Sequence, residues 1–126
     1  HSHTEPHQTE NKQDASESVF LTKAIELVEK NLHVPGYSVE QLSRDLCMER
    51  TGLYRKLVAM LDQSPSLFIR NIRLQRAAQL ILEGSLSITE IAERTGFSSS
   101  SYLSKCFQEM YGCRPSEYAE KMQKST

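Results

Sequence analysis

Apolar residues recur at helical spacing through nearly all of the chain after residue 18. Residues three and four positions apart lie on the same side of an α-helix, so this spacing predicts helices with one inward face. The predicted helices lie at about 19–31, 39–46, 50–61, 65–83, 88–95, 99–111 and from 115 onward. The pattern therefore predicts an all-α fold of about seven helices.

Polar residues and glycines mark where several of these helices begin and end. Two of them open with the S-x-x-Q or S-x-x-E spacing of a capping box, at Ser38 with Gln41 and at Ser87 with Glu90. Ser64-Pro65 is typical of a helix start, and Gly84 of a helix end. The long helix between them has roughly 19 residues and a length of about 28 Å.

Residues 39–68 and 88–118 are two imperfect copies of one pattern. The offset is 49 residues in the first part of each copy and 50 from Leu53 onward, so that Leu53 corresponds to Leu103 and Arg55 to Lys105. Each copy predicts a short capped helix, a tight turn and a second helix. This is the outline of a helix-turn-helix, which places its second helix in the DNA major groove.

Four parts follow from this organisation: 1–18, a first helix-turn-helix subdomain over 19–64, a linker helix over 65–84, and a second subdomain over 85–126. One turn of B-DNA is about 34 Å, so the linker helix could hold two reading helices about one turn apart. Residues 1–18 are polar and lack periodicity, which predicts a disordered linker or an artificial remnant. The chain does not begin with Met, so we expect a fragment or a processed product.

The distribution of charge matters more here than its total. The net charge is −1, but residues 1–18 hold four acids against Lys12, and the remainder carries +2. Between Arg50 and Arg76 six basic residues face one acid, Asp62, a local balance of +5. A local cationic face attracts phosphates whatever the total charge. A solvated helix face is the alternative interpretation.

The sequence carries no recognisable catalytic constellation. It lacks a nucleophile elbow, a P-loop and an H-E-x-x-H motif, so we expect neither an enzyme nor a cofactor. Three cysteines without metal spacing, and no apolar run long enough for a membrane span, indicate a cytoplasmic domain with reduced thiols. Histidines 1, 3 and 7 could bind a metal, but such tail histidines are more often incidental, so no metal site is predicted.

Polar residues on the second helix of each unit are the candidate DNA contacts. Base contacts are predicted, from the first unit to the second, at Arg50, Thr51, Tyr54, Arg55, Ser99, Ser100, Ser104 and Lys105. Phosphate contacts are predicted at Ser38, Lys56, Arg73, Ser87 and Ser98. Serine hydroxyls both donate and accept, so the second unit is expected to discriminate sequence more weakly.

Several of these residues have a second interpretation. Tyr54 could pack on the linker helix, Arg55 could pair with Asp45, and Lys56 and Lys105 could be solvated surface. Three linker-helix arginines could contact phosphate or pair internally and lock the two subdomains together: Arg70, Arg73 and Arg76.

Two stretches resemble the AraC/XylS family of bacterial transcription regulators, and the similarity covers about residues 19–120. Residues 87–118, SITEIAERTGFSSSSYLSKCFQEMYGCRPSEY, resemble the second-unit signature of that family, and residues 69–82, IRNIRLQRAAQLIL, resemble its linker helix. Three positions depart from the pattern. Cys47 replaces the usual first-turn glycine, Asp62 stands where the second unit has Gly112, and Lys105 replaces a more common arginine.

This resemblance implies sequence-specific binding to double-stranded promoter DNA and transcriptional control, usually activation through contact with RNA polymerase. It also implies a separate signal-input region and no small-molecule ligand in this domain, and it leaves homodimerisation on DNA open. Residues 53–82 are particularly similar to the output domain of Bacteroides-type hybrid two-component regulators, in which a sensor kinase and a receiver precede this domain. Such a full-length protein could be membrane-anchored. A helical protein-interaction module without specific DNA binding is the rival hypothesis.

Overall fold

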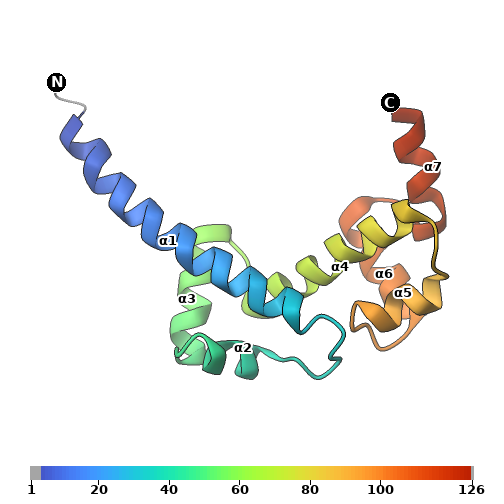
Figure 1. The fold of residues 1–126 in the computed structure, drawn as a ribbon, viewed down its shortest axis with the longest axis horizontal. Helices are drawn as coiled ribbons and strands as arrows, with labels where there is room; N and C mark the ends of the chain where they lie inside the picture. Colours follow the sequence, from blue (N-terminus) through green and yellow to red (C-terminus); the bar gives the residue numbers. More distant parts are fainter. Residues whose placement is uncertain (1–3, 126) are drawn as a thin grey trace.

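The computed structural model describes the backbone of residues 4–125 and the side chains of residues 16–123. Within this part of the chain every regular element is a helix, which confirms the predicted all-α fold. The seven helices are α1 (Thr4–Lys30), α2 (Val39–Asp45), α3 (Arg50–Leu61), α4 (Pro65–Glu83), α5 (Ile88–Arg94), α6 (Ser100–Tyr111) and α7 (Pro115–Ser125) (Figure 1).

The predicted capping residues define the helix starts. In α2 and α5 the Ser38 and Ser87 hydroxyls accept from the third helical N–H, and the Gln41 and Glu90 side chains accept from the cap N–H in return. The Ser64 hydroxyl accepts from the backbone N–H of Leu67 at the start of α4. These bonds satisfy N–H groups that a helix start otherwise leaves without a partner, which is why local sequence located these boundaries well.

Two separate hydrophobic cores lie at the two ends of α4, and they define the two lobes of the molecule (Figure 1). The first lobe consists of α1, α2, α3 and the amino-terminal half of α4, which contributes Phe68, Ile69 and Ile72. The second consists of α5, α6, α7 and the other half of α4, which contributes Leu74, Ala77, Ala78 and Leu80. The change from one core to the other falls at Arg73.

Residues 4–18 correct one prediction. They were predicted to be disordered, but they continue α1 as helix from Thr4, and this part of α1 extends away from the first lobe (Figure 1). The segment has no glycine, and its proline, Pro6, lies in the first turn, where proline is tolerated. Its three Glu and two Gln residues and Lys12 favour helix even without an apolar stripe. Residues 1–3 lie outside the described part.

The turns between α2 and α3 and between α5 and α6 have the same backbone geometry. Cys47 in the first turn and Gly96 in the second are both left-handed, with φ of 56° and 80°. The following N–H closes each turn, from Met48 to the Ser43 carbonyl at 2.8 Å and from Phe97 to the Ala92 carbonyl at 2.9 Å. Cysteine in place of glycine therefore leaves the turn conformation intact but puts a side chain where glycine is favoured.

Candidate nucleic-acid interface

The second helix of the first unit, α3, has one buried and one exposed face. Leu53 and Leu57 are fully buried against the first core. Thr51, Tyr54 and Arg55 are exposed, because at 3.6 residues per turn they lie on other sides of the helix. Arg50 opens the helix with its side chain 65% exposed. All four predicted base-contacting residues of this unit thus lie at the amino end or on the open side of α3.

The second helix of the second unit, α6, repeats this arrangement. It begins and ends 50 residues after α3, and its buried Leu103 and Phe107 correspond to Leu53 and Leu57. Lys105 is exposed at the position of Arg55, while Ser100 and Ser104 are partly exposed. The two helices therefore present equivalent faces, one rich in arginine and one rich in serine.

Ser99 lies at the N-cap of α6, one residue before the helix begins. Its hydroxyl accepts from the backbone N–H of Tyr102 at 3.0 Å and caps α6. The corresponding cap in the first unit is Glu49, not a predicted contact residue. The residue equivalent to Thr51 is Ser101, which is exposed and which the sequence prediction did not include. Extending the offset of 50 residues back to the first residue of the helix would have identified it.

The structure shows which alternative contacts the first-unit residues make. No ion pair joins Arg55 to Asp45 among the described side chains, and Asp45 instead accepts from the Tyr37 hydroxyl at 2.9 Å. Tyr54 is 52% exposed and lines a shallow groove with the start of α4, so it is only partly packed. Arg50 lies 3.7 Å from the Glu40 carboxylate, a solvent-exposed pair of little stability that a phosphate or base could replace.

The predicted phosphate-contacting residues fall in different environments. Ser38, Ser87 and Ser98 are exposed at or near helix amino termini, where backbone N–H groups favour anions. Lys56 is partly buried, and its ammonium lies over the Phe20 ring of α1, 4.5 Å from the ring centroid. This cation–π contact holds Lys56 on the side of α3 that packs against α1, away from the exposed face.

Arg73 does not occupy a phosphate-contacting position, so that prediction is wrong. The residue is only 6% exposed, and its guanidinium donates to backbone carbonyls of both lobes. The acceptors are Thr95 of the second lobe and three residues of the first, Leu32, Val34 and Tyr37. We call this set of hydrogen bonds the Arg73 bridge. Burial lowers the pKa of Arg73. The alternative interpretation, an internal lock between the lobes, matches this geometry.

Gly96 makes the Arg73 bridge possible. A Cβ atom at this position would collide with the Arg73 guanidinium and with the Leu32 carbonyl oxygen. The glycine therefore serves two needs at once: the left-handed turn and the close approach of the two lobes.

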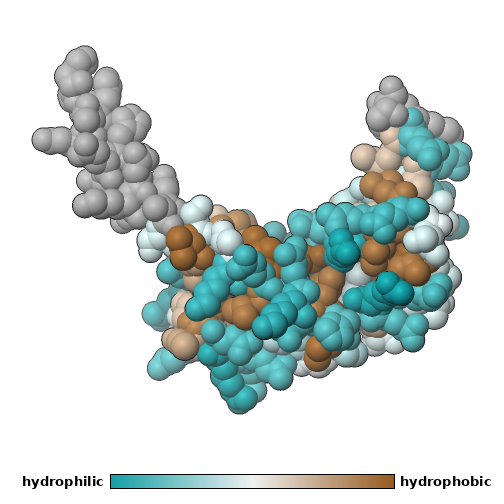
Figure 2. Space-filling view, in the orientation of Figure 1, coloured by the Kyte–Doolittle hydropathy of each residue, from teal (hydrophilic) through white to brown (hydrophobic). Residues whose placement is uncertain are grey.

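One face of the molecule is largely hydrophilic. Figure 2 shows hydrophilic residues over both lobes on one face, with hydrophobic residues in separate patches between them. Among the described side chains, no group of three or more His, Cys, Asp or Glu residues could hold a metal ion. In the same part of the chain, no helix has the length and apolar character needed to cross a membrane.

Comparison with known proteins identifies the family. The sequence profile of a helix-turn-helix domain matches residues 42–121, which include nearly all of the first unit and all of the second. A crystal structure from Chromobacterium violaceum, described as a transcriptional regulator with an AraC-type DNA-binding domain, has 30% sequence identity and a TM-score of 0.76. It covers 85% of this chain, and the chain covers 95% of it. The chain belongs to the AraC type of helix-turn-helix domain.

Two further relatives of this AraC-type domain are informative. The histidine kinase P4 of Formosa agariphila is 39% identical over 99 residues, which are 79% of this chain but only 7% of the kinase. The DNA-binding domain of AdpA, solved in complex with a target DNA, has the same fold, with a TM-score of 0.73 at 24% identity. That alignment covers 83% of this chain and 94% of the AdpA domain.

Proposed function

We propose that this AraC-type domain binds specific sequences in double-stranded promoter DNA and regulates transcription. The carrying observation is that α3 and α6, with the same length and equivalent exposed faces, belong to two lobes that the Arg73 bridge ties together. In this proposal α3 and α6 enter two major-groove segments about one turn apart. The DNA complex of AdpA supports the proposal by fold.

The two helices have unequal roles in this proposal. Arg50 and Arg55 of α3 can donate two hydrogen bonds to the O6 and N7 atoms of guanine, which discriminates well between bases. Tyr54 and Thr51 contribute contacts to thymine methyl groups or phosphates. The face of α6, with Ser100, Ser101, Ser104 and Lys105 as its polar residues, contributes more to phosphate contact and less to sequence reading.

The remaining roles concern the whole protein. The similarity to a histidine kinase supports a receiver and a sensor as the signal-input region, with this domain as the output. Activation through contact with RNA polymerase follows the family pattern, and dimerisation on DNA is a further expectation.

Selection of bound sites from a random DNA pool, followed by footprinting of the selected site, tests the proposal. We expect two protected major-groove segments whose centres lie about 10 base pairs apart. Arg55→Ala should weaken binding to that site by about 1–3 kcal/mol and relax the sequence preference in one segment. If a gel shift at micromolar protein and low salt shows no protein–DNA complex, the proposal is contradicted and a protein-interaction module is favoured.

A further inference from the structure

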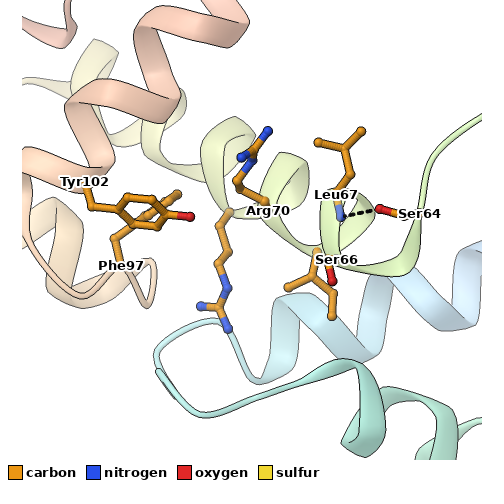
Figure 3. Close-up of a pocket in the computed structure, with 8 residues that line it drawn as sticks. Ser64, Ser66, Leu67, Arg70, Phe97 and Tyr102 are labelled. Carbon is orange, nitrogen blue, oxygen red and sulfur yellow. Dashed lines mark hydrogen bonds between the residues drawn. The ribbon is translucent and has the colours of Figure 1, made fainter. Parts of the chain in front are cut away.

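A crevice separates the two lobes along α4 and has a volume of about 480 Å³. Ser64, Ser66 and Arg70 line it from the first lobe, and Phe97 and Tyr102 line it from the second. In Figure 3 the Tyr102 side chain points from α6 toward α4, which carries Ser66 and Arg70. The lining residues contribute arginines and hydroxyl groups but no carboxylate. The crevice is therefore suited to an anion.

The guanidinium of Arg70 contains a hydrogen-bond donor without an acceptor in the described part of the chain. Its Nε atom is buried and has no partner among the described residues, and no described carboxylate lies within ion-pair distance of its guanidinium. The other two arginines of α4 differ, since Arg73 donates to four carbonyls and Arg76 donates to the Gln79 side chain at 2.8 Å. Buried donors without a partner are rare in folded proteins, so Arg70 is the α4 arginine whose hydrogen-bonding capacity the fold leaves unused.

Two hydroxyl groups line the same crevice as Arg70, those of Ser66 and Tyr102, and neither makes a hydrogen bond within the described part of the chain. Ser66 precedes Arg70 by four residues and so lies on the same face of α4. Tyr102 is 45% exposed, and its ring packs edge-on against Phe97 at 5.8 Å between centroids, which fixes its direction. One arginine and two hydroxyl-bearing residues thus line the same crevice.

The position of the crevice identifies the anion. Ser64 and Ser66 also line the groove at Arg50, Thr51 and Tyr54, the amino end of α3. Tyr102 lies in the first turn of α6. A ligand that extends from α3 to α6 therefore passes the crevice. Between two major-groove segments on one face of B-DNA, the duplex presents its minor groove and the two phosphate backbones that border it.

We propose that the crevice receives a backbone phosphate from the DNA between the two major-groove segments, with Arg70 donating to the phosphate oxygens and Ser66 and Tyr102 assisting. This inference rests on the proposed function. A guanidinium can form two parallel hydrogen bonds with a phosphate, which gives the contact a defined geometry. Such a contact does not distinguish between bases. Its effect would be to fix the register of both lobes on the duplex.

The test combines Arg70→Gln with uncharged methylphosphonates placed singly along the DNA between the two protected segments. With wild-type protein, we expect one or two central positions where the substitution weakens binding about ten-fold. With Arg70→Gln, binding to unmodified DNA should fall by a similar factor, and the same methylphosphonates should cost little more. The slope of log K against log salt should fall in magnitude by about 0.9.

Arg76→Gln is the matched control, because Arg76 is an exposed α4 arginine that does not line the crevice. It should leave the salt slope and the methylphosphonate profile unchanged. Thermal unfolding would verify that Arg70→Gln is folded, and Tyr102→Phe, which removes only a hydroxyl, should give a smaller loss at the same central phosphates.

Two contrary outcomes are distinguishable. If wild-type protein binds its selected DNA but no central methylphosphonate weakens binding, the inference is wrong and the proposed function stands. The same holds if a folded Arg70→Gln keeps the wild-type salt slope. If wild-type protein binds no DNA, the proposed function fails, and this inference fails with it.

Discussion

The guanidinium of Arg73 and the backbone carbonyl oxygen of Thr95 are hydrogen-bonded at 2.7 Å, although the two residues belong to different structural units. Arg73 lies where α4 passes from one hydrophobic core to the other, and Thr95 ends α5 in the second lobe. The other acceptors of Arg73 follow α1 in the first lobe. One buried side chain therefore connects the end of α1 to the turn before α6.

Arg73→Met should destabilise the domain by about 3–5 kcal/mol, because it leaves several buried carbonyl groups without their charged donor. Urea unfolding would measure the loss, and separate transitions for the two lobes would show that they have become uncoupled. Arg76→Met is the control and should change stability by less than about 0.5 kcal/mol, since Arg76 is exposed. A loss below 1 kcal/mol for Arg73→Met would show that the bridge is unimportant.

Gly96→Ala should destabilise far more than the same change at two other left-handed glycines, Gly84 and Gly112. All three have φ between 74° and 80°, so each substitution costs about 1 kcal/mol from the backbone. Only at Gly96 does the added Cβ also meet other groups, the Arg73 guanidinium and the Leu32 carbonyl. We expect about 2 kcal/mol or more beyond the two controls in chemical denaturation. Equal losses at all three positions would exclude a packing role for Gly96.

Cys47→Gly should stabilise the domain by about 1 kcal/mol, because Cys47 is left-handed with φ of 56° and exposed. Cys47→Ala should bring no such gain, since alanine has the same backbone penalty. Thermal unfolding of both variants under reducing conditions separates the backbone effect from thiol chemistry. A gain with alanine as large as that with glycine would contradict the explanation.

Glu90→Gln should change how stability depends on pH. The backbone N–H of Ser87 donates to the Glu90 carboxylate, and this bond lowers the pKa of Glu90 in the folded protein. A lowered folded-state pKa gives stability that is present above the unfolded-state pKa and lost as the pH falls through the folded-state pKa. The stability difference between wild type and Glu90→Gln should therefore shrink below about pH 4. A difference that stays constant down to pH 2.5 would rule out this linkage.

Ser101→Ala should weaken DNA binding without loss of stability, and Ser99→Ala should lower stability without weakening DNA binding. Ser101 lies on the exposed face of α6, so its loss should weaken DNA binding about two- to ten-fold with little effect on stability. Ser99 caps α6, so its loss should cost about 1 kcal/mol of stability. Gel shifts on the selected site and thermal melts would measure both quantities. Weaker DNA binding from Ser99→Ala alone would restore the original assignment.

Local sequence predicted the helices well where a chemical marker stands at the boundary. The bounds of α4 match the prediction, because Ser64, Pro65 and Gly84 act on their immediate neighbours. The start of α1 was missed, since residues 4–18 have neither an apolar stripe nor a clear cap, and their helix depends on intrinsic propensity. Hydrophobic periodicity predicts a helix only where apolar residues recur at helical spacing.

The candidate site was predictable as far as the repeat could be followed residue by residue. Two adjacent serines could each have capped α6, and a shift of one residue placed Ser99 among the base contacts in place of Ser101. The role of Arg73 was harder to foresee, because spacing on α4 does not determine which side of the helix the second lobe covers. That information lies in long-range packing between residues that are far apart in the sequence.

The Arg73 bridge also makes DNA binding sensitive to the number of base pairs between the two target segments. If both lobes grip one duplex, each base pair inserted between their targets moves one target by about 3.4 Å and turns it by about 34–36° around the DNA axis. Two lobes joined by a flexible linker could follow that displacement. Two lobes joined through a buried guanidinium can follow it only if the protein or the DNA is strained. Promoters would then be selected by the distance between the two half-sites as well as by the base sequence of each half-site.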